Sequence, residues 1–220
     1  ELSFAESGDR IAIFGTDYDS NDLNAVSTFA GSGNDGYLDG NAESAMFSHS
    51  FENMITDSSG NILVADLDNM AIRKIDSKGN VTTFYKGNNG DNELRGPSGM
   101  AFDSSGNLYV AEAHEHRVSI IDPQGNLTRL KDGQNGDYLR FDNQVIDVAF
   151  DSQGVLFVLE EHRISKIEFI GDAVFKSNFV GSGNWGDNDG FGDQAQFGIA
   201  RNIVFDSEGY MYYVDREHHK

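Results

Sequence analysis

The sequence predicts an all-β chain made of copies of one four-stranded antiparallel unit. Glycine is frequent, with 25 residues against 2 prolines, and aromatic residues make up 11% of the chain. No long segment has helical periodicity, so short strands joined by tight turns are the expected structure. A second observation supports this fold class, because one short phrase recurs along the whole chain at nearly constant intervals.

The recurring phrase reads F-D-S-x-G-N and continues into an alternating apolar segment. Clear copies begin at Thr56, Phe102, Phe150 and Phe205, and a weaker copy begins at Phe4. Aspartate and glycine supply the geometry of a tight turn, and the alternation that follows is typical of a strand. The anchoring glycines are separated by 52, 46, 48 and 55 residues and are Gly8, Gly60, Gly106, Gly154 and Gly209. This period is typical of one four-stranded blade of a β-propeller.

Two glycine-rich loops between the units match each other without a gap at an offset of 150 residues. Seven positions agree, namely Gly31, Gly33, Gly36, Asp39, Gly40, Ala45 and Phe47 with Gly181, Gly183, Gly186, Asp189, Gly190, Ala195 and Phe197. The offset corresponds to three repeats, so the loops are also copies of one element.

The loop G-S-G-N-D-G-Y-L-D-G-N-A-E-S-A-M-F and the following D-S-S-G-N-I-L-V-A-D-L-D-N-M-A-I-R-K-I resemble the NHL repeat. The resemblance covers nearly the whole chain and is strongest to bacterial surface proteins in which the propeller follows an IPT/TIG domain. It departs at residues 15–24, where a regular third strand is missing, and before His162, where the turn is two residues short.

The resemblance implies an NHL-type β-propeller over residues 1–220, with about five blades visible. The expected blade units are 1–30, 48–85, 96–130, 145–180 and an incomplete fifth at 198–220. A parent ring of six blades, linked to another domain outside this segment, is one expectation. A smaller ring closed by the N-terminal segment and residues 209–215 is the alternative. The resemblance also implies an extracellular, periplasmic or cell-surface location.

Composition restricts the partners. The chain has 16 Lys and Arg against 36 Asp and Glu, a net charge of -20, so nucleic acid is not an expected partner. No apolar run reaches the length of a membrane span, and direct membrane insertion is not expected. The absence of cysteine excludes disulfides and cysteine-based zinc sites.

One acidic position recurs six residues after the anchoring glycine in four units. These residues are Asp66, Glu112, Glu160 and Asp215. In a propeller they lie toward the face that carries the long loops between blades, where ligands usually bind. A ring of carboxylates there would hold Ca²⁺ or a cationic ligand. The alternative is a structural role, in which each carboxylate accepts backbone N–H bonds in its own turn.

Two acidic loops and one histidine are further candidates. The loop with Asp17, Asp19 and Asn21 and the loop with Asp187 and Asp189 partly match a calcium-binding loop, but neither has the full ligand pattern. His114 is flanked by Glu112 and Glu115, which suits either general acid–base chemistry or an exposed turn. No cofactor is therefore expected, with Ca²⁺ as the candidate to test.

Two functions stay open. The first is a non-catalytic scaffold that binds a protein or glycan, because no G-x-S-x-G or Walker-type motif with the required context is present. Its exposed aromatic candidates lie in the long loops and are Tyr37, Tyr138, Trp185 and Phe191. The second is a metal-dependent propeller hydrolase or lyase, similar to lactonases or amidoglycolate lyases, with a cation in the central channel. The first strands, which are expected to line the channel, are apolar, and the polar exceptions just before them, at the channel mouth, are Asn53, Ser98, Asp147 and Asn202.

Overall fold

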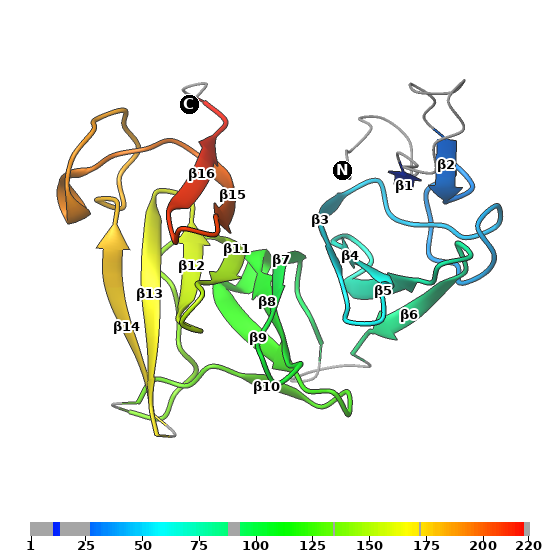
Figure 1. The fold of residues 1–220 in the computed structure, drawn as a ribbon, viewed down its shortest axis with the longest axis horizontal. Coiled ribbons are helices and arrows are strands. Elements are labelled where there is room, and N and C mark those ends of the chain that lie inside the picture. Colours follow the sequence, from blue (N-terminus) through cyan, green and yellow to red (C-terminus); the bar gives the residue numbers. More distant parts are fainter. Residues whose placement is uncertain (1–10, 14–26, 88–92, 134, 172, 218–220) are drawn as a thin grey trace. The chain divides into compact units, whose positions relative to one another are not determined.

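The computed structural model describes residues 11–13, 27–87, 93–133, 135–171 and 173–217, and its sheets are antiparallel (Figure 1). The chain divides into two compact units, Glu1–Gly87 and Asn88–Lys220. The described residues include three four-stranded sheets and two two-stranded sheets. None of the helices in these ranges is both long and apolar enough to span a membrane. The all-β fold class and the four-stranded antiparallel repeat are confirmed.

The first unit holds one complete sheet. Its strands follow each other in the order β3-β4-β5-β6 and are Phe51–Thr56, Ile62–Asp66, Ala71–Ile75 and Val81–Tyr85. The glycine loop contributes Ala45 and Phe47 to the core beside Val64 and Ile75. The loop is therefore packed into the unit and is not a free linker.

A two-stranded sheet precedes it and consists of β1 (Ile11–Ile13) and β2 (Ser27–Ala30). The alignment of the weak first phrase predicts that β1 is a second strand. In the structure β1 pairs directly with β2, with Ile11 opposite Ala30, as a third strand pairs with the last strand in the complete sheets. The segment at 15–24, where the sequence lacks a regular third strand, lies outside the described residues.

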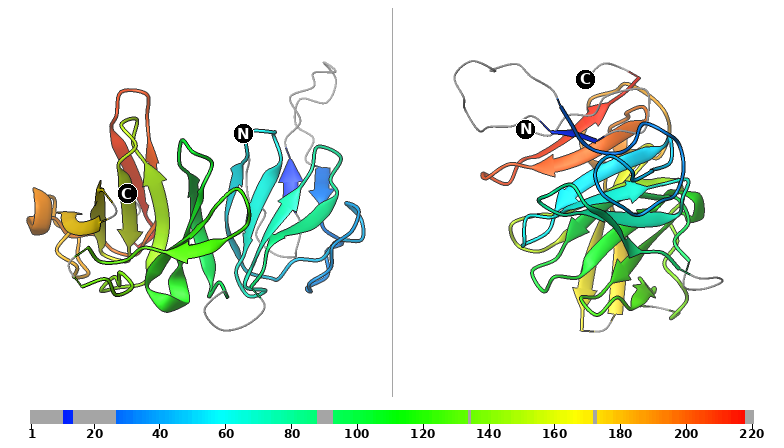
Figure 2. Two further views of the ribbon diagram at one scale, coloured as in Figure 1. Left: turned by 90° about the horizontal axis from the view of Figure 1, so that it is seen from below. Right: turned by 90° about the vertical axis from the view of Figure 1, so that its right-hand side faces the viewer.

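The second unit holds two complete sheets and a two-stranded one (Figures 1 and 2). The strands of the first are β7 to β10: Pro97–Phe102, Leu108–Glu112, Arg117–Ile121 and Leu127–Arg129. Those of the second are β11 to β14: Val145–Phe150, Leu156–Glu160, Arg163–Ile170 and Ala173–Val180. The last pair is β15 and β16: Ala200–Phe205 and Met211–Asp215. The first strand β11 contacts both β7 and β15, so successive sheets meet along their first strands, as propeller blades do.

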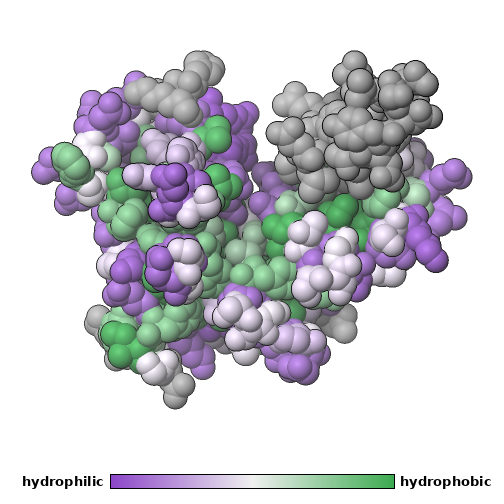
Figure 3. Space-filling model, viewed as in Figure 1, coloured by the Kyte–Doolittle hydropathy of each residue, from purple (hydrophilic) through white to green (hydrophobic). Residues whose placement is uncertain are grey.

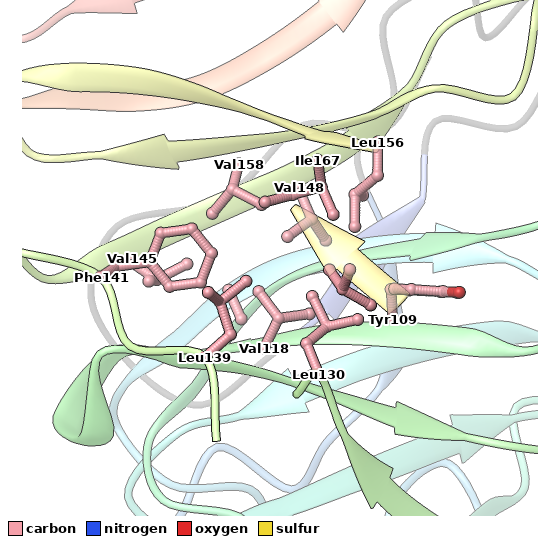
Figure 4. Packing of buried hydrophobic residues seen from close by; sticks show 12 residues of the cluster. Tyr109, Val118, Leu130, Leu139, Phe141, Val145, Val148, Leu156, Val158 and Ile167 are labelled. Atoms are coloured by element: carbon pink, nitrogen blue, oxygen red, sulfur yellow. The ribbon is translucent and has the colours of Figure 1, made fainter. Parts of the chain in front are cut away.

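Burial on both faces of the second strands shows how the sheets stack. Leu156 and Val158 of β12 belong to the core shared with the preceding sheet, which also contains Val118 (Figure 4). Phe157 and Leu159 point the other way, into the core shared with β15. Because side chains alternate along a strand, a strand buried on both faces must be apolar at every position.

The recurring phrase forms the predicted turns. In the turn after β3, the Asp57 carboxylate accepts the backbone N–H of Ser59 and of Asn61, both at 2.9 Å, and Gly60 has a φ of +79°. The second turn of the same sheet repeats this arrangement around Asp76. There the side-chain hydrogen bond from Asn80 holds the pKa of the Asp76 carboxyl below its usual value. The aspartate and glycine are thus required by the turn geometry.

Candidate functional site

The four recurring carboxylates end the second strands and are buried, with 0 to 3% of each residue exposed. Each accepts a backbone N–H from the segment that enters the first strand of its own sheet. The pairs are Ser48 N with Asp66 at 2.9 Å, Arg95 N with Glu112 at 2.8 Å, Asp142 N with Glu160 at 3.1 Å and Gly198 N with Asp215 at 2.7 Å. The carboxylate therefore fastens the incoming loop to the second strand. This placement favours the structural alternative, although the donors belong mainly to the incoming loop and not to the carboxylate's own turn.

The partners of these carboxylates differ from sheet to sheet. Asp66 pairs with the fully buried Arg73 at 3.0 Å. Glu112 pairs with Arg117 at 2.9 Å and accepts a hydrogen bond from the Ser119 hydroxyl. Glu160 accepts the Ser165 hydroxyl at 2.6 Å. Buried charges need such compensation because leaving one unpaired costs several kcal/mol.

The two matching glycine loops use their side chains differently. In the first unit the Tyr37 hydroxyl lies 2.6 Å from the Thr83 hydroxyl, and the Arg73 guanidinium lies 4.7 Å from the Tyr37 ring centroid. Arg73 also pairs with Asp39 at 2.7 Å. Tyr37 and Asp39 are thus engaged within their own unit.

The copy of this loop in the second unit, at residues 181–197, leaves large aromatic side chains exposed. Trp185 is 61% exposed and donates its ring N–H to Glu217, while Phe191 is 93% exposed. Asp187 and Asp189 are exposed, and Asp189 forms no ion pair with any described residue. Figure 3 shows apolar residues scattered among hydrophilic ones on one face of this unit. Among the sequence-predicted sites that the structure describes, this loop is the most accessible.

A second polar site lies where the first strands of the second unit meet. Asp147 of β11 is 2% exposed, and its carboxylate accepts the side-chain N–H of Asn202 at 2.7 Å and the backbone N–H of Ile203 at 3.0 Å. Both donors belong to β15. Burial raises the pKa of the Asp147 carboxyl to about 7. No ion pair with Asp147 exists among the described residues, so only hydrogen bonds, including the backbone N–H groups of Ile203 and Val148, offset part of the cost of burying its charge.

Gly99 of β7 makes room for this carboxyl group, and the sequence alone did not single it out. A Cβ on Gly99 would lie 2.0 Å from the Oδ1 atom of Asp147. Gly99, Asp147 and Asn202 each lie seven residues before the anchoring glycine of their phrase, next to a register shift in the first strand. Ser98 is one position earlier, and its hydroxyl donates instead to the carbonyls of Ala111 and Val145 at 3.3 Å each.

Asn53 holds the corresponding position in the first unit. Its Oδ1 atom is buried and has no hydrogen-bond partner among the described residues. The same repeat position therefore carries a polar side chain in both units, at Asn53 in the first and at Asp147 and Asn202 in the second, and the structure shows a hydrogen-bond partner for the carboxylate of Asp147.

The remaining candidates are separate from these sites. His114 is exposed in the short helix η2 (Ala113–Glu115), and its ring lies against the backbone of Gly96. Asp17, Asp19 and Asn21 lie outside the described residues. Across the described ranges no three His, Asp or Glu side chains gather in a way that would hold a metal ion. Ca²⁺ binding stays a prediction.

Comparisons with known proteins agree with the geometry. Residues 94–121 match the model of the NHL repeat. No curated protein matches the chain. A gluconolactonase from Xanthomonas campestris superimposes with a TM-score of 0.61 at 12% identity over 86% of this chain and 59% of that one. A streptogramin B lyase superimposes with a TM-score of 0.58 at 15% identity, over 97% of this chain and 64% of that one. An auxiliary nutrient binding protein from Bacteroides ovatus superimposes with a TM-score of 0.51 at 14% identity, over 83% of this chain and 56% of that one.

The fold is therefore that of a β-propeller, and the chain carries an NHL repeat. At these identities the solved structures establish the fold alone. The chain spans less than two thirds of the length of the solved structures described above. The association with an IPT/TIG domain stays a prediction.

Proposed function

We propose that the chain is a non-catalytic recognition propeller of the bacterial cell envelope or exterior, which binds a protein or glycan through the loops between its sheets. One contrast carries the proposal. The recurring carboxylates, the best sequence candidates for a ligand ring, are buried and bound by the protein's own groups. The aromatic side chains of the loop at 181–197 are instead exposed to solvent.

The backbone of this loop is held in place, which favours binding. Gly181 N donates to Gly192 O at 3.0 Å, and Gln196 N donates to Asn188 O at 2.8 Å. Phe197 anchors the end of the loop in the core. A fixed loop loses little conformational entropy when a partner binds, and exposed tryptophan and phenylalanine side chains are suited to anchor such a partner. The similarity to a nutrient binding protein agrees with this role.

A metal-dependent hydrolase or lyase is the second candidate, and one observation favours it. Asp147 is a buried carboxyl with a pKa of about 7 on a first strand, and protonation near neutral pH suits a general acid or base. Two of the similar structures are a gluconolactonase and a lyase. The only side-chain donor to Asp147 among the described residues is the amide of Asn202, which is not a catalytic acid or base.

A paired binding and activity experiment separates the two functions. The protein is tested against protein and glycan arrays, and against lactone substrates with Ca²⁺ or EDTA. We expect a bound ligand whose affinity falls about tenfold or more in Phe191→Ala or Trp185→Ala, and no lactone turnover. Lactone turnover that Asp147→Asn abolishes would overturn the proposal in favour of the enzyme.

A further inference from the structure

A cavity of ≈ 480 Å³ lies in the second unit, where the loop between β10 and β11 meets β14. Six of its lining residues are charged or aromatic: Asp132, Asp137, Tyr138, Arg140, Phe175 and Lys176. The volume lies within the range of small-ligand sites, which span about 300 to 1,000 Å³. None of the four recurring carboxylates lines it, so it is distinct from the sites described above.

The wall of the cavity is built by backbone contacts. Asp132 forms a parallel bridge with Val174 of β14, and Gly133 N donates to Val174 O at 2.8 Å. A Cβ on Gly133 would lie 2.8 Å from that of Ala173, so only glycine permits this approach. The loop closes on itself through Asp132 N, which donates to Asp137 O at 2.8 Å.

Two buried anchors hold the far end of the same loop. Leu139 and Phe141 are each 4% exposed and belong to the core cluster that also contains Val174. The Lys176 ammonium lies 5.1 Å from the Phe141 ring centroid and donates to Arg140 O at 3.0 Å. The cavity therefore has its shape before any ligand enters, which lowers the entropic cost of binding.

The lining combines one exposed aromatic ring with charges of both signs. Tyr138 is 41% exposed, and the Arg129 guanidinium lies 5.8 Å from its ring centroid. Asp132 and Asp137 supply acceptors, and Arg140 and Lys176 supply donors. Arg140 also pairs with Glu115 at 3.2 Å, and Lys176 lies 3.8 Å from Asp142, so neither cation is left to attract an anionic ligand. An uncharged ligand with many hydroxyl groups and one apolar face fits this combination, because hydroxyls both donate and accept while the apolar face stacks on the ring.

We propose that this cavity binds a neutral sugar residue of a glycan, with Tyr138 as the stacking platform and Asp137 as a hydroxyl acceptor. The inference rests on the proposed recognition function and names the ligand class for one part of the loop surface. A peptide side chain is the competing occupant.

The test uses the whole chain on an array of neutral and acidic glycans, followed by calorimetric titration of the best neutral glycan. We expect Tyr138→Ala to weaken that binding about tenfold or more, and Tyr138→Phe, which keeps the ring, to stay within about threefold of the wild type. Asp137→Asn keeps the shape and is expected to weaken binding less than Tyr138→Ala. Unchanged thermal midpoints show that the variants are folded.

A control variant and three contrary outcomes make the result decisive. Tyr210→Ala removes an exposed aromatic side chain from the turn between β15 and β16 of the same unit, and we expect it to leave neutral-glycan binding unchanged. Glycan binding that Phe191→Ala abolishes and Tyr138→Ala does not would overturn the cavity proposal while the recognition function holds. Binding of peptides but not glycans, lost in Tyr138→Ala, would assign the cavity to a peptide. Lactone turnover without any binding would overturn the recognition function itself.

Discussion

The buried carboxyl of Asp147 makes the stability of the second unit depend on pH near neutrality, where ordinary carboxylates no longer titrate. Its pKa rises from 3.8 to about 7 because the carboxylate is buried without a cation. The folded state therefore binds the proton more tightly than the unfolded state. The contribution of Asp147 to the free energy of unfolding is therefore fully present below about pH 4 and is lost as pH rises through about 7.

The magnitude follows from the difference in pKa. A difference of about 3 units at about 1.4 kcal/mol per unit gives about 4 kcal/mol in total, of which about 3 kcal/mol falls between about pH 5 and about pH 8. Asp147→Asn removes this titration and keeps the size of the side chain. The new amide group meets the backbone N–H of Val148 or of Ile203, which costs about 1 to 3 kcal/mol at every pH.

The assay is urea unfolding followed by the fluorescence of Trp185, the single tryptophan of the sequence, which lies in the same unit as Asp147. The difference in unfolding free energy between wild type and variant cancels all other titrating groups. We expect this difference to shift by about 3 kcal/mol in favour of the variant as pH rises from about 5 to about 8. Parallel pH profiles would show that Asp147 is ionised in the folded state and would refute the reasoning.

Three further predictions concern packing around the buried polar groups. Arg73→Met leaves two carboxylates without their cation and is expected to destabilise the first unit by about 3 to 5 kcal/mol in thermal unfolding followed by circular dichroism, whereas Lys78→Met in an exposed turn changes little. Gly99→Ala places a methyl group against the carboxyl of Asp147 and is expected to lower the free energy of unfolding by about 3 kcal/mol in urea. Gly154 has a φ of +80° with open space around it, so Gly154→Ala is expected to cost only about 1 kcal/mol. Ser165→Ala removes a buried donor and is expected to cost about 1 to 3 kcal/mol in the same assay, and no measurable change would contradict the role of its hydroxyl.

The sequence was sufficient to predict the repeat because its punctuation is local. A turn with aspartate at its start and glycine at a positive φ is dictated by a few neighbouring residues, so Gly60 and Gly106 are visible as anchors. Met70 and His116 each lie ten residues after their anchoring glycine, so they hold one repeat position. In the structure both adopt a positive φ, of 53° and 50°, which is uncommon for residues other than glycine and which the spacing alone does not predict.

The polar contacts between sheets could not be predicted in the same way. A register shift in the first strand separates Pro97 from Met100, and such a bulge changes which residue faces the neighbouring strand. The polar residue Ser98 attracted attention in the sequence, but the neighbouring Gly99 is the position equivalent to Asp147. A glycine that makes room for a distant carboxyl carries no signal of its own in a single sequence.

The partner of the recurring carboxylate differs between sheets, and the length of the carboxylate side chain differs with it. The shorter aspartate Asp66 binds the long side chain of Arg73, which lies opposite Val64, two residues before Asp66. The longer glutamate Glu160 binds the short side chain of Ser165, which lies opposite Val158, two residues before Glu160. Either combination spans the distance between the strands.

Only arginine extends further, to the carboxylate of Asp39 and the backbone of the loop. The matching loop at 181–197 enters β15, in another sheet, and there the Trp185 ring N–H donates to Glu217 while the Asp189 side chain is exposed. The two loops thus share a sequence pattern and differ in what their side chains bind, so the recognition surface is to be sought at the loop whose aromatic side chains are exposed.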